Sequence, residues 1–231
     1  MVTAQESRAA LELVADAAVV TAQELLTQTL GEPVEVRRAT LLAGVPAIVS
    51  EYQDGSAALA VDFYEEERER AAVRSPFTPE LVVVDRTVKL RRAVAWSADP
   101  LFDDDELAAG ERLAQVVQIE AARPYRDTIT QNRRRDPASA GWTRVPNPGA
   151  CRFCRFLAAK GAVYKRDSAL FAAHTTCKCS AAPVFKGGEQ GPEATVEQYI
   201  ASKRRRTPEQ QAALRNWLDY FEETGSLKLP A

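Results

Sequence analysis

The sequence predicts a mainly α-helical protein that carries a small metal-binding α+β module before its C-terminal helices. Two observations support this class: apolar residues recur at helical spacing through the first 130 or so positions, and the cysteines are paired at metal-ligand spacing. With 231 residues, 45% of them hydrophobic and 27% charged, the chain can form one large or two small domains. We expect an α-helical domain (1–136), a small zinc-binding module (141–186), and a linker with C-terminal helices (187–231).

The first predicted helix covers residues 5–30 and ends at Gly31, because glycine after an apolar periodic run is a helix stop. A second helix is expected over residues 34–51. Pro46 should kink or interrupt it, since proline lacks the backbone N–H of a helical hydrogen bond.

A third helix is expected over residues 54–73, with Leu59 and Phe63 on one face. Two prolines then break the helical pattern in residues 75–79. Residues 81–96 fit a strand through their β-branched side chains and a helix through their spacing. Helical neighbours and the lack of a turn signal favour the helix.

Residues 97–105 read as a turn, in which Asp103 or Asp104 caps the next helix. Pro124 should start a further short helix, which brings the helical domain to six helices. The residues expected to face inward from the capped helix are Leu107, Leu113, Val116 and Val117.

Short elements are expected after a boundary at residues 136–142. A strand at 142–145 precedes one short helix that ends at Gly161, and two more strands follow at 162–165 and 180–185.

The C-terminal region begins with a glycine-bearing linker, followed by a helix over about residues 194–204. Thr207 should cap a last helix that ends at Gly225. Its apolar stripe should pack on the chain itself, although docking into a partner's groove is an alternative. The stripe consists of Leu214, Trp217, Leu218 and Phe221.

All four cysteines and the only histidine lie in one window, spaced as C-x2-C and then H-x2-C-x-C. Zinc takes four such donors at tetrahedral corners, so this spacing predicts a structural zinc site. The five candidate ligands are Cys151, Cys154, His174, Cys177 and Cys179.

Disulfides and plain buried cysteines are the alternatives to zinc. The first thirty residues have no apolar core typical of a signal peptide, so we expect a reducing compartment, which favours the metal. Cys151, Cys154 and Cys179 are the preferred ligands, with either His174 or Cys177 at the fourth corner. The basic residues near them in sequence could offset the thiolate charge or form an ordinary solvated face. These are Arg152, Arg155, Lys165, Arg166 and Lys178.

The segment RVPNPGACRFCRFLAAKGAVY, followed by HTTCKC and a short apolar strand, resembles the C-terminal module of the phage Mu gpF-like (MuF) minor head proteins, in the form found in actinobacteriophages. Thr175 stands where many relatives have proline. The resemblance is specific over residues 141–186 and weaker upstream, from Tyr52 to Arg70 and in the helical segment before Gly141. The family pattern maps onto Cys151, Cys154, Gly161, His174, Cys177 and Cys179.

This resemblance implies a structural minor head protein of a tailed bacteriophage, with a structural Zn²⁺ knot and a role in head morphogenesis or in DNA packaging or ejection. The implied partners are the phage portal and/or the major capsid protein, with packaged DNA as a further partner. The implied location is the virion, in the capsid interior or portal region, after synthesis in the host cytoplasm. No membrane association is expected, since no apolar run has the length to cross a bilayer. No small-molecule substrate is expected either.

We do not expect an enzyme. Ser/His or Cys/His catalysis needs a histidine, and His174 lies among the metal ligands. Some actinobacteriophage relatives join a capsid maturation protease to a MuF-like module, so a protease-associated component is a less favoured alternative.

A zinc-containing nucleic-acid-binding protein is the other alternative. Two basic clusters could contact phosphates, although the net charge of −2 does not attract nucleic acid by itself. The clusters are Arg133, Arg134 and Arg135, and Lys203, Arg204, Arg205 and Arg206.

Overall fold

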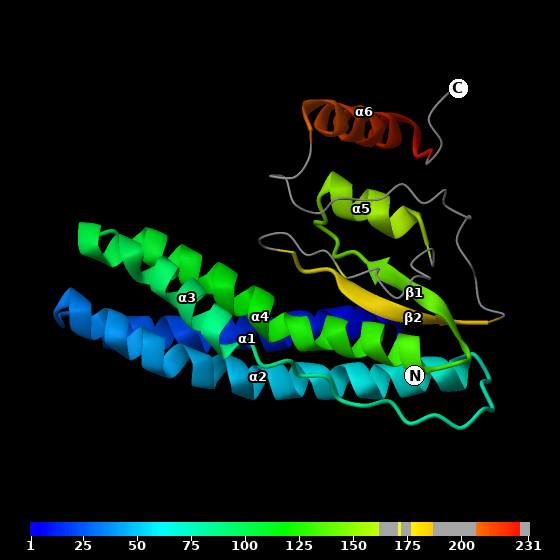
Figure 1. The fold of residues 1–231 in the computed structure, drawn as a ribbon, viewed down its shortest axis with the longest axis horizontal. Helices are drawn as coiled ribbons and strands as arrows, with labels where there is room; N and C mark the ends of the chain where they lie inside the picture. The colour runs from blue at the N-terminus through cyan, green and yellow to red at the C-terminus, as the bar shows by residue number, and fades with distance from the viewer. Residues whose placement is uncertain (162–170, 172–176, 187–206, 227–231) are drawn as a thin grey trace.

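The computed structural model describes residues 1–161, 171, 177–186 and 207–226, and these residues confirm the mainly α-helical class. Three long helices and the shorter α3 form an elongated bundle. A two-stranded sheet covers one half of it, α5 lies over the sheet and α6 lies on α5 (Figure 1). The elements in chain order are α1 (Ala4–Gln28), α2 (Val34–Arg70), α3 (Thr87–Ala98), the 3-10 turn η1 (Asp99–Asp103), α4 (Glu106–Arg135), β1 (Ser139–Val145), α5 (Arg152–Ala159), β2 (Ser180–Phe185) and α6 (Pro208–Thr224).

Two prolines lie inside long helices. The helical region has four α-helices in place of the predicted six, because α2 joins the helices expected over residues 34–51 and 54–73, and α4 joins the capped helix to the one expected to start at Pro124. Helix α2 continues through Pro46, and α4 continues through Pro124. Each proline removes one backbone hydrogen bond. Val45 and Val49 on either side of Pro46 are fully buried, and so is Tyr125 next to Pro124. Tertiary packing on both sides of each proline therefore outweighs the lost bond.

Residues 81–86 are neither helix nor strand, and only Thr87–Ala98 form the helix predicted over 81–96. Side chains of α4 supply the hydrogen bonds that a helix would have made. Asn132 accepts from the N–H of Glu80 at 2.8 Å and donates to its carbonyl at 2.7 Å. Thr128 accepts from the N–H of Val82 at 3.1 Å. These hydrogen bonds to a distant helix outweigh the helical pattern of this segment.

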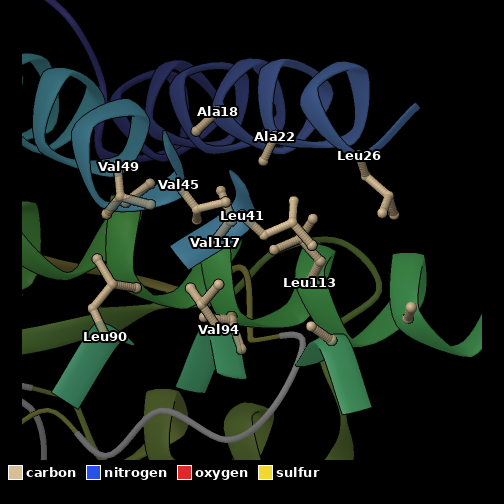
Figure 2. Packing of buried hydrophobic residues seen from close by; sticks show 14 of the residues in the cluster. Ala18, Ala22, Leu26, Leu41, Val45, Val49, Leu90, Val94, Leu113 and Val117 are labelled. Carbon is tan, nitrogen blue, oxygen red and sulfur yellow. The ribbon is translucent and has the colours of Figure 1, made fainter. Parts of the chain in front are cut away.

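The first core cluster, drawn in Figure 2, lies in the half of the bundle away from the sheet (Figure 1). Leu113, Val116 and Val117 of α4 point into it as predicted. The prediction for Leu107 was wrong, because its side chain is 74% exposed. Helix α4 begins later than the predicted cap, with Asp105 accepting a hydrogen bond from the N–H of Ala108 at 2.9 Å. Leu107 therefore lies in the first turn, outside the core.

These two leucines allow a matched test of the core. Leu113→Ala should lower the free energy of unfolding by about 2–5 kcal/mol, since it leaves a cavity among buried side chains. Leu107→Ala should change it by less than about 0.5 kcal/mol, because the side chain is already in water. Urea denaturation of both variants checks this, and equal effects would contradict the assigned orientation of α4.

The sheet shares the second core cluster with the helices. Strands β1 and β2 pair antiparallel, with Trp142 opposite Pro183. Trp142 and Phe185 pack in one cluster with residues of α1, α2 and α4, including Phe63 and Tyr125. The strands thus share a core with the helices. The division into a domain ending at residue 136 and a module starting at residue 141 stays a prediction.

The junction between α4 and β1 is held by buried polar contacts. The carboxylate of Asp136 pairs with Arg68 of α2 and accepts a hydrogen bond from the hydroxyl of Tyr64 at 3.3 Å. The guanidinium of Arg68 also lies 5.2 Å from the ring centre of Phe77. These contacts join the end of α4 to α2 and set the start of the sheet.

Helix α6 is capped by Thr207 and ends at Gly225, as predicted. Thr207 and Gln210 form the capping box, and Gly225 ends the helix in the left-handed region at a φ of 67°. The helix packs on α5, as the prediction of packing within the chain required: Phe156 contacts Trp217 and Phe221, with ring centres 4.7 and 5.4 Å apart. None of the described helices combines the length and apolar character that crossing a membrane requires. The helix predicted at 194–204 and the strand at 162–165 lie outside the described residues.

Candidate metal centre

Three cysteine sulfurs form one buried group. The Sγ atoms of Cys154, Cys177 and Cys179 all lie within 4.8 Å of one another, and each residue is at most 3% exposed. None of the four cysteines, all in the described part of the chain, is in a disulfide. The three sulfurs could hold a metal ion.

Two elements bring these sulfurs together. Cys154 lies in the first turn of α5, and its side chain points inward beside Phe153. Cys177 and Cys179 lie in the chain that leads into β2. Residues two apart in an extended chain point to the same side, so both sulfurs face α5. Pairing of β2 with β1 holds this lead-in beside the start of α5.

The geometry fits a tetrahedral thiolate site. Zinc–sulfur bonds of about 2.3 Å place neighbouring sulfurs about 3.8 Å apart at tetrahedral corners. The Sγ atoms of Cys154 and Cys177 are 4.0 Å apart. Only a small adjustment would bring the three sulfurs to bonding distance of one ion.

The fourth corner has two candidates. Cys151 caps the N-terminus of α5, one turn before Cys154, is exposed, and is not a member of the sulfur group. His174 lies outside the described residues. The sequence preferred Cys151, Cys154 and Cys179, with Cys177 or His174 as the fourth ligand. The structure instead brings Cys177 beside Cys154 and Cys179, and leaves Cys151 outside the group.

Two buried arginines surround the sulfurs, and sequence reasoning missed both. Arg126 of α4 donates to the carbonyls of Cys177 and Cys179 at 2.8 and 3.0 Å. Nη1 of Arg144, on β1, lies 3.8 Å from the sulfurs of both Cys154 and Cys177. Both guanidinium groups lie against the ring of Phe171, at 4.9 and 3.9 Å from its centre. They provide positive charge where three thiolates and a divalent ion would leave a net negative charge.

A sequence signal for Arg126 was present but weak. It lies four residues after Ala122 and three before Ile129, both buried, so it occupies the inward face of α4. A charged residue on a core face indicates a buried partner, but the sequence does not say that the partner is a pair of backbone carbonyls 51 and 53 residues away.

The cluster favours one thiolate even without a metal. Hydrogen bonds from Cys154 and Cys179 lower the pKa of Cys177, and the charge of Arg126 lowers it further, against the effect of burial. Hydrogen bonds with Cys177 and Cys179, together with burial, raise the pKa of Cys154. Burial lowers the pKa of Arg126. A bound ion would displace the remaining thiol protons, so metal binding should release protons.

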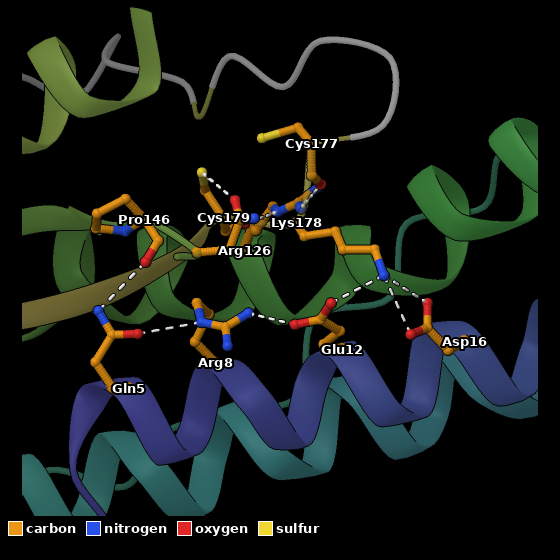
Figure 3. Close-up of polar contacts among 10 residues, drawn as sticks. Gln5, Arg8, Glu12, Asp16, Arg126, Pro146, Cys177, Lys178 and Cys179 are labelled. Carbon is orange, nitrogen blue, oxygen red and sulfur yellow. Dashed lines mark hydrogen bonds and ion pairs between the residues drawn. The ribbon is translucent and has the colours of Figure 1, made fainter. Parts of the chain in front are cut away.

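Helix α1 holds the cluster from the side opposite α5. Lys178, between the two cysteines, pairs with Glu12 at 2.9 Å and Asp16 at 3.2 Å (Figure 3). These carboxylates raise the pKa of Lys178. Its side chain therefore points away from the sulfurs and anchors the cysteine segment to the bundle.

The other basic residues near the cysteines have different positions. Arg152 pairs with Asp219, and Arg155 pairs with Glu222 at 2.7 Å, so both join α5 to α6. Lys165 and Arg166 lie outside the described residues.

The predicted phosphate-binding clusters are only partly described. Arg133 is 9% exposed, and Arg135 pairs with Glu80. The cluster from Lys203 to Arg206 lies outside the described residues.

A family model, VG15 protein, matches residues 1–202. The chain belongs to the VG15 family. This is a phage-associated family of viral proteins, so the chain is a phage protein. The match to VG15 covers the four-helix bundle, the sheet and all four cysteines. Comparisons with curated proteins and with solved structures gave no match.

Proposed function

We propose that this VG15 protein is a structural minor head protein of a tailed phage, of the MuF and actinobacteriophage type, associated with the portal or the capsid. The family match supports the phage assignment, and the resemblance of residues 141–186 supports the head role. We further propose that the cysteine group holds a structural zinc ion and that the chain is not an enzyme.

The observation that carries the structural role of the metal is the burial of three sulfurs between α5, the sheet and the bundle. A catalytic zinc keeps one position open to water and is usually bound by histidine or carboxylate. Three buried thiolates beside Phe171 and two arginines instead suit a closed site. When bound, the ion would supply a cross-link between the start of α5 and the chain leading into β2.

Such a cross-link has a mechanical consequence. Helix α5 contacts β1 and α6, whereas Cys177 and Cys179 are tied to α4 through Arg126 and to α1 through Lys178. The ion would therefore join the outer layer of α5 and α6 to the four-helix bundle. A small outer layer held in this way keeps a defined surface for a partner in the head.

The head role is tested by expressing the chain together with the portal and major capsid proteins of its phage and isolating the assembled particles. We expect the chain to sediment with particles, in few copies per particle, and the Cys177→Ser variant to be depleted from them. Leu107→Ala, which truncates an exposed side chain away from the sulfur group, serves as the control variant. A wild-type chain that stays in the unassembled fraction, while complete particles form without it, would refute the head role.

A further inference from the structure

The outer face of α3 carries a cationic surface that has no role in the proposed function. Helix α3 has no acidic residue and buries Leu90, Val94, Ser97 and Ala98. Its three cations, Lys89, Arg91 and Arg92, are all exposed.

The three cations share one side of the helix. At 100° per residue, Arg91 and Lys89 flank Arg92, and the arc between them is the arc opposite the buried residues. The cations therefore point into solvent together.

These cations have no carboxylate partner within the described residues. Elsewhere, arginines pair regularly with acids, as Arg37 does with Glu106 at 2.6 Å and Arg155 with Glu222 at 2.7 Å. No ion pair or hydrogen bond is found for the side chains of Lys89, Arg91 or Arg92 in the described part of the chain.

The surroundings add positive charge. Before α3, Arg86 lies 3.1 Å from Glu120, and Arg123 lies 3.2 Å from the same carboxylate, so two guanidinium groups share one acid. Toward the C-terminal end of α3, the guanidinium of Arg112 lies 4.9 Å from the ring centre of Trp96. The acid at the end of the helix, Asp99, is 3.7 Å from Arg38. Glu120 and Asp99 thus have cationic neighbours of their own, and Asp85, before α3, accepts a hydrogen bond from the N–H of Thr87 at 2.9 Å.

We propose that the outer face of α3 binds the phosphate backbone of duplex DNA through Lys89, Arg91 and Arg92. A row of unpaired cations on a rigid helix matches a polyanion, and it gives affinity without base specificity. This inference goes beyond the head role and does not depend on the metal. It also places the DNA contact away from Arg133 and Arg135, which are buried or paired.

The test measures binding of a fluorescent 20-base-pair duplex of arbitrary sequence to the full chain by anisotropy. Each phosphate contact contributes a slope of about −0.9 in log K against log salt, so three contacts predict a slope of about −2.7. Affinity should then fall about 40-fold between 50 and 200 mM salt. Arg91→Ala/Arg92→Ala should weaken binding about tenfold at 50 mM salt and reduce the slope by about 1.8.

Arg74→Ala/Arg215→Ala is the matched control, since it removes two exposed guanidinium groups elsewhere on the chain. It should keep the affinity within about twofold and retain the slope. Equal losses in the two double variants would overturn the assignment to α3, and so would wild-type binding with no salt dependence. Tighter binding of labelled polyglutamate than of a duplex of equal charge would also overturn it, because α3 would then fit an acidic protein surface better. Circular dichroism confirms that both variants are folded.

Discussion

Replacing Cys177 with serine is expected to abolish stoichiometric zinc binding and to lower the melting temperature to that of the chelated wild-type chain. Cys177 lies with Cys154 and Cys179 in the buried sulfur group, and a hydroxyl is a poor substitute for a thiolate on zinc. Elemental analysis should find one zinc per wild-type chain and none in the variant. Thermal melts with and without EDTA should differ for the wild type only.

The size of this effect depends on how much of the fold relies on the ion. Zinc binding supplies about 10–16 kcal/mol in small zinc-finger peptides, which have little other core. Here the half of the bundle away from the sheet has its own core, which includes Leu41, Val94 and Leu113. Metal removal should therefore first loosen α5, α6 and the chain leading into β2, and hydrogen exchange should show faster exchange there than in α1 to α4.

Cys151→Ser identifies the fourth ligand. A loss of zinc affinity as large as that of Cys177→Ser would mean that Cys151 closes the site, and an unchanged affinity would assign that corner to His174. A Cys177→Ser variant that still binds one zinc per chain with wild-type affinity would exclude the buried sulfur group as the metal centre.

Arg126→Met is expected to lower zinc affinity by about 10- to 100-fold, the usual effect of removing a residue that orients metal ligands. Arg126 holds the carbonyls of both Cys177 and Cys179, and its charge favours the thiolate of Cys177. The substitution should lower the free energy of unfolding less in the metal-free chain than in the zinc-bound chain. Without the ion, Arg126 is a buried charge whose removal offsets part of the lost hydrogen bonding. Competition with a chromophoric chelator measures the affinity, and urea denaturation with and without zinc measures the difference.

Arg123→Met is the matched control on the same helix. Arg123 is 28% exposed in its side chain and pairs with Glu120, away from the cysteines. It should leave zinc affinity within about twofold of the wild type. If Arg126→Met also leaves the affinity unchanged, the guanidinium serves only to satisfy backbone carbonyls and does not organise the metal ligands.

Local chemistry made several elements predictable from sequence. The Thr207 and Gln210 capping box and the Gly225 stop set α6, because each acts on its own turn of helix. The strands β1 and β2 and the short helix α5 lie where turn residues and apolar runs placed them. The C-x2-C and C-x-C spacings pointed to a common metal window, since residues so close in sequence are constrained to be close in space.

The parts that sequence reasoning missed depend on contacts between distant residues. Helix α2 passes through Pro46 because of packing on both sides of it. Residues 80 and 82 stay outside a helix because the side chains of Asn132 and Thr128, respectively, bond to their backbone. No pattern within ten residues contains that information.

The sequence by itself determined that the protein is mainly helical, that it resembles phage proteins, and that its candidate metal ligands lie in one short segment. Only the tertiary structure decided that Cys177 joins Cys154 and Cys179, and that Arg126 and Arg144 surround them. The physical reason is that ligand spacing limits which sulfurs can meet, whereas the pairing of β1 with β2 and their packing on α4 select which of them do.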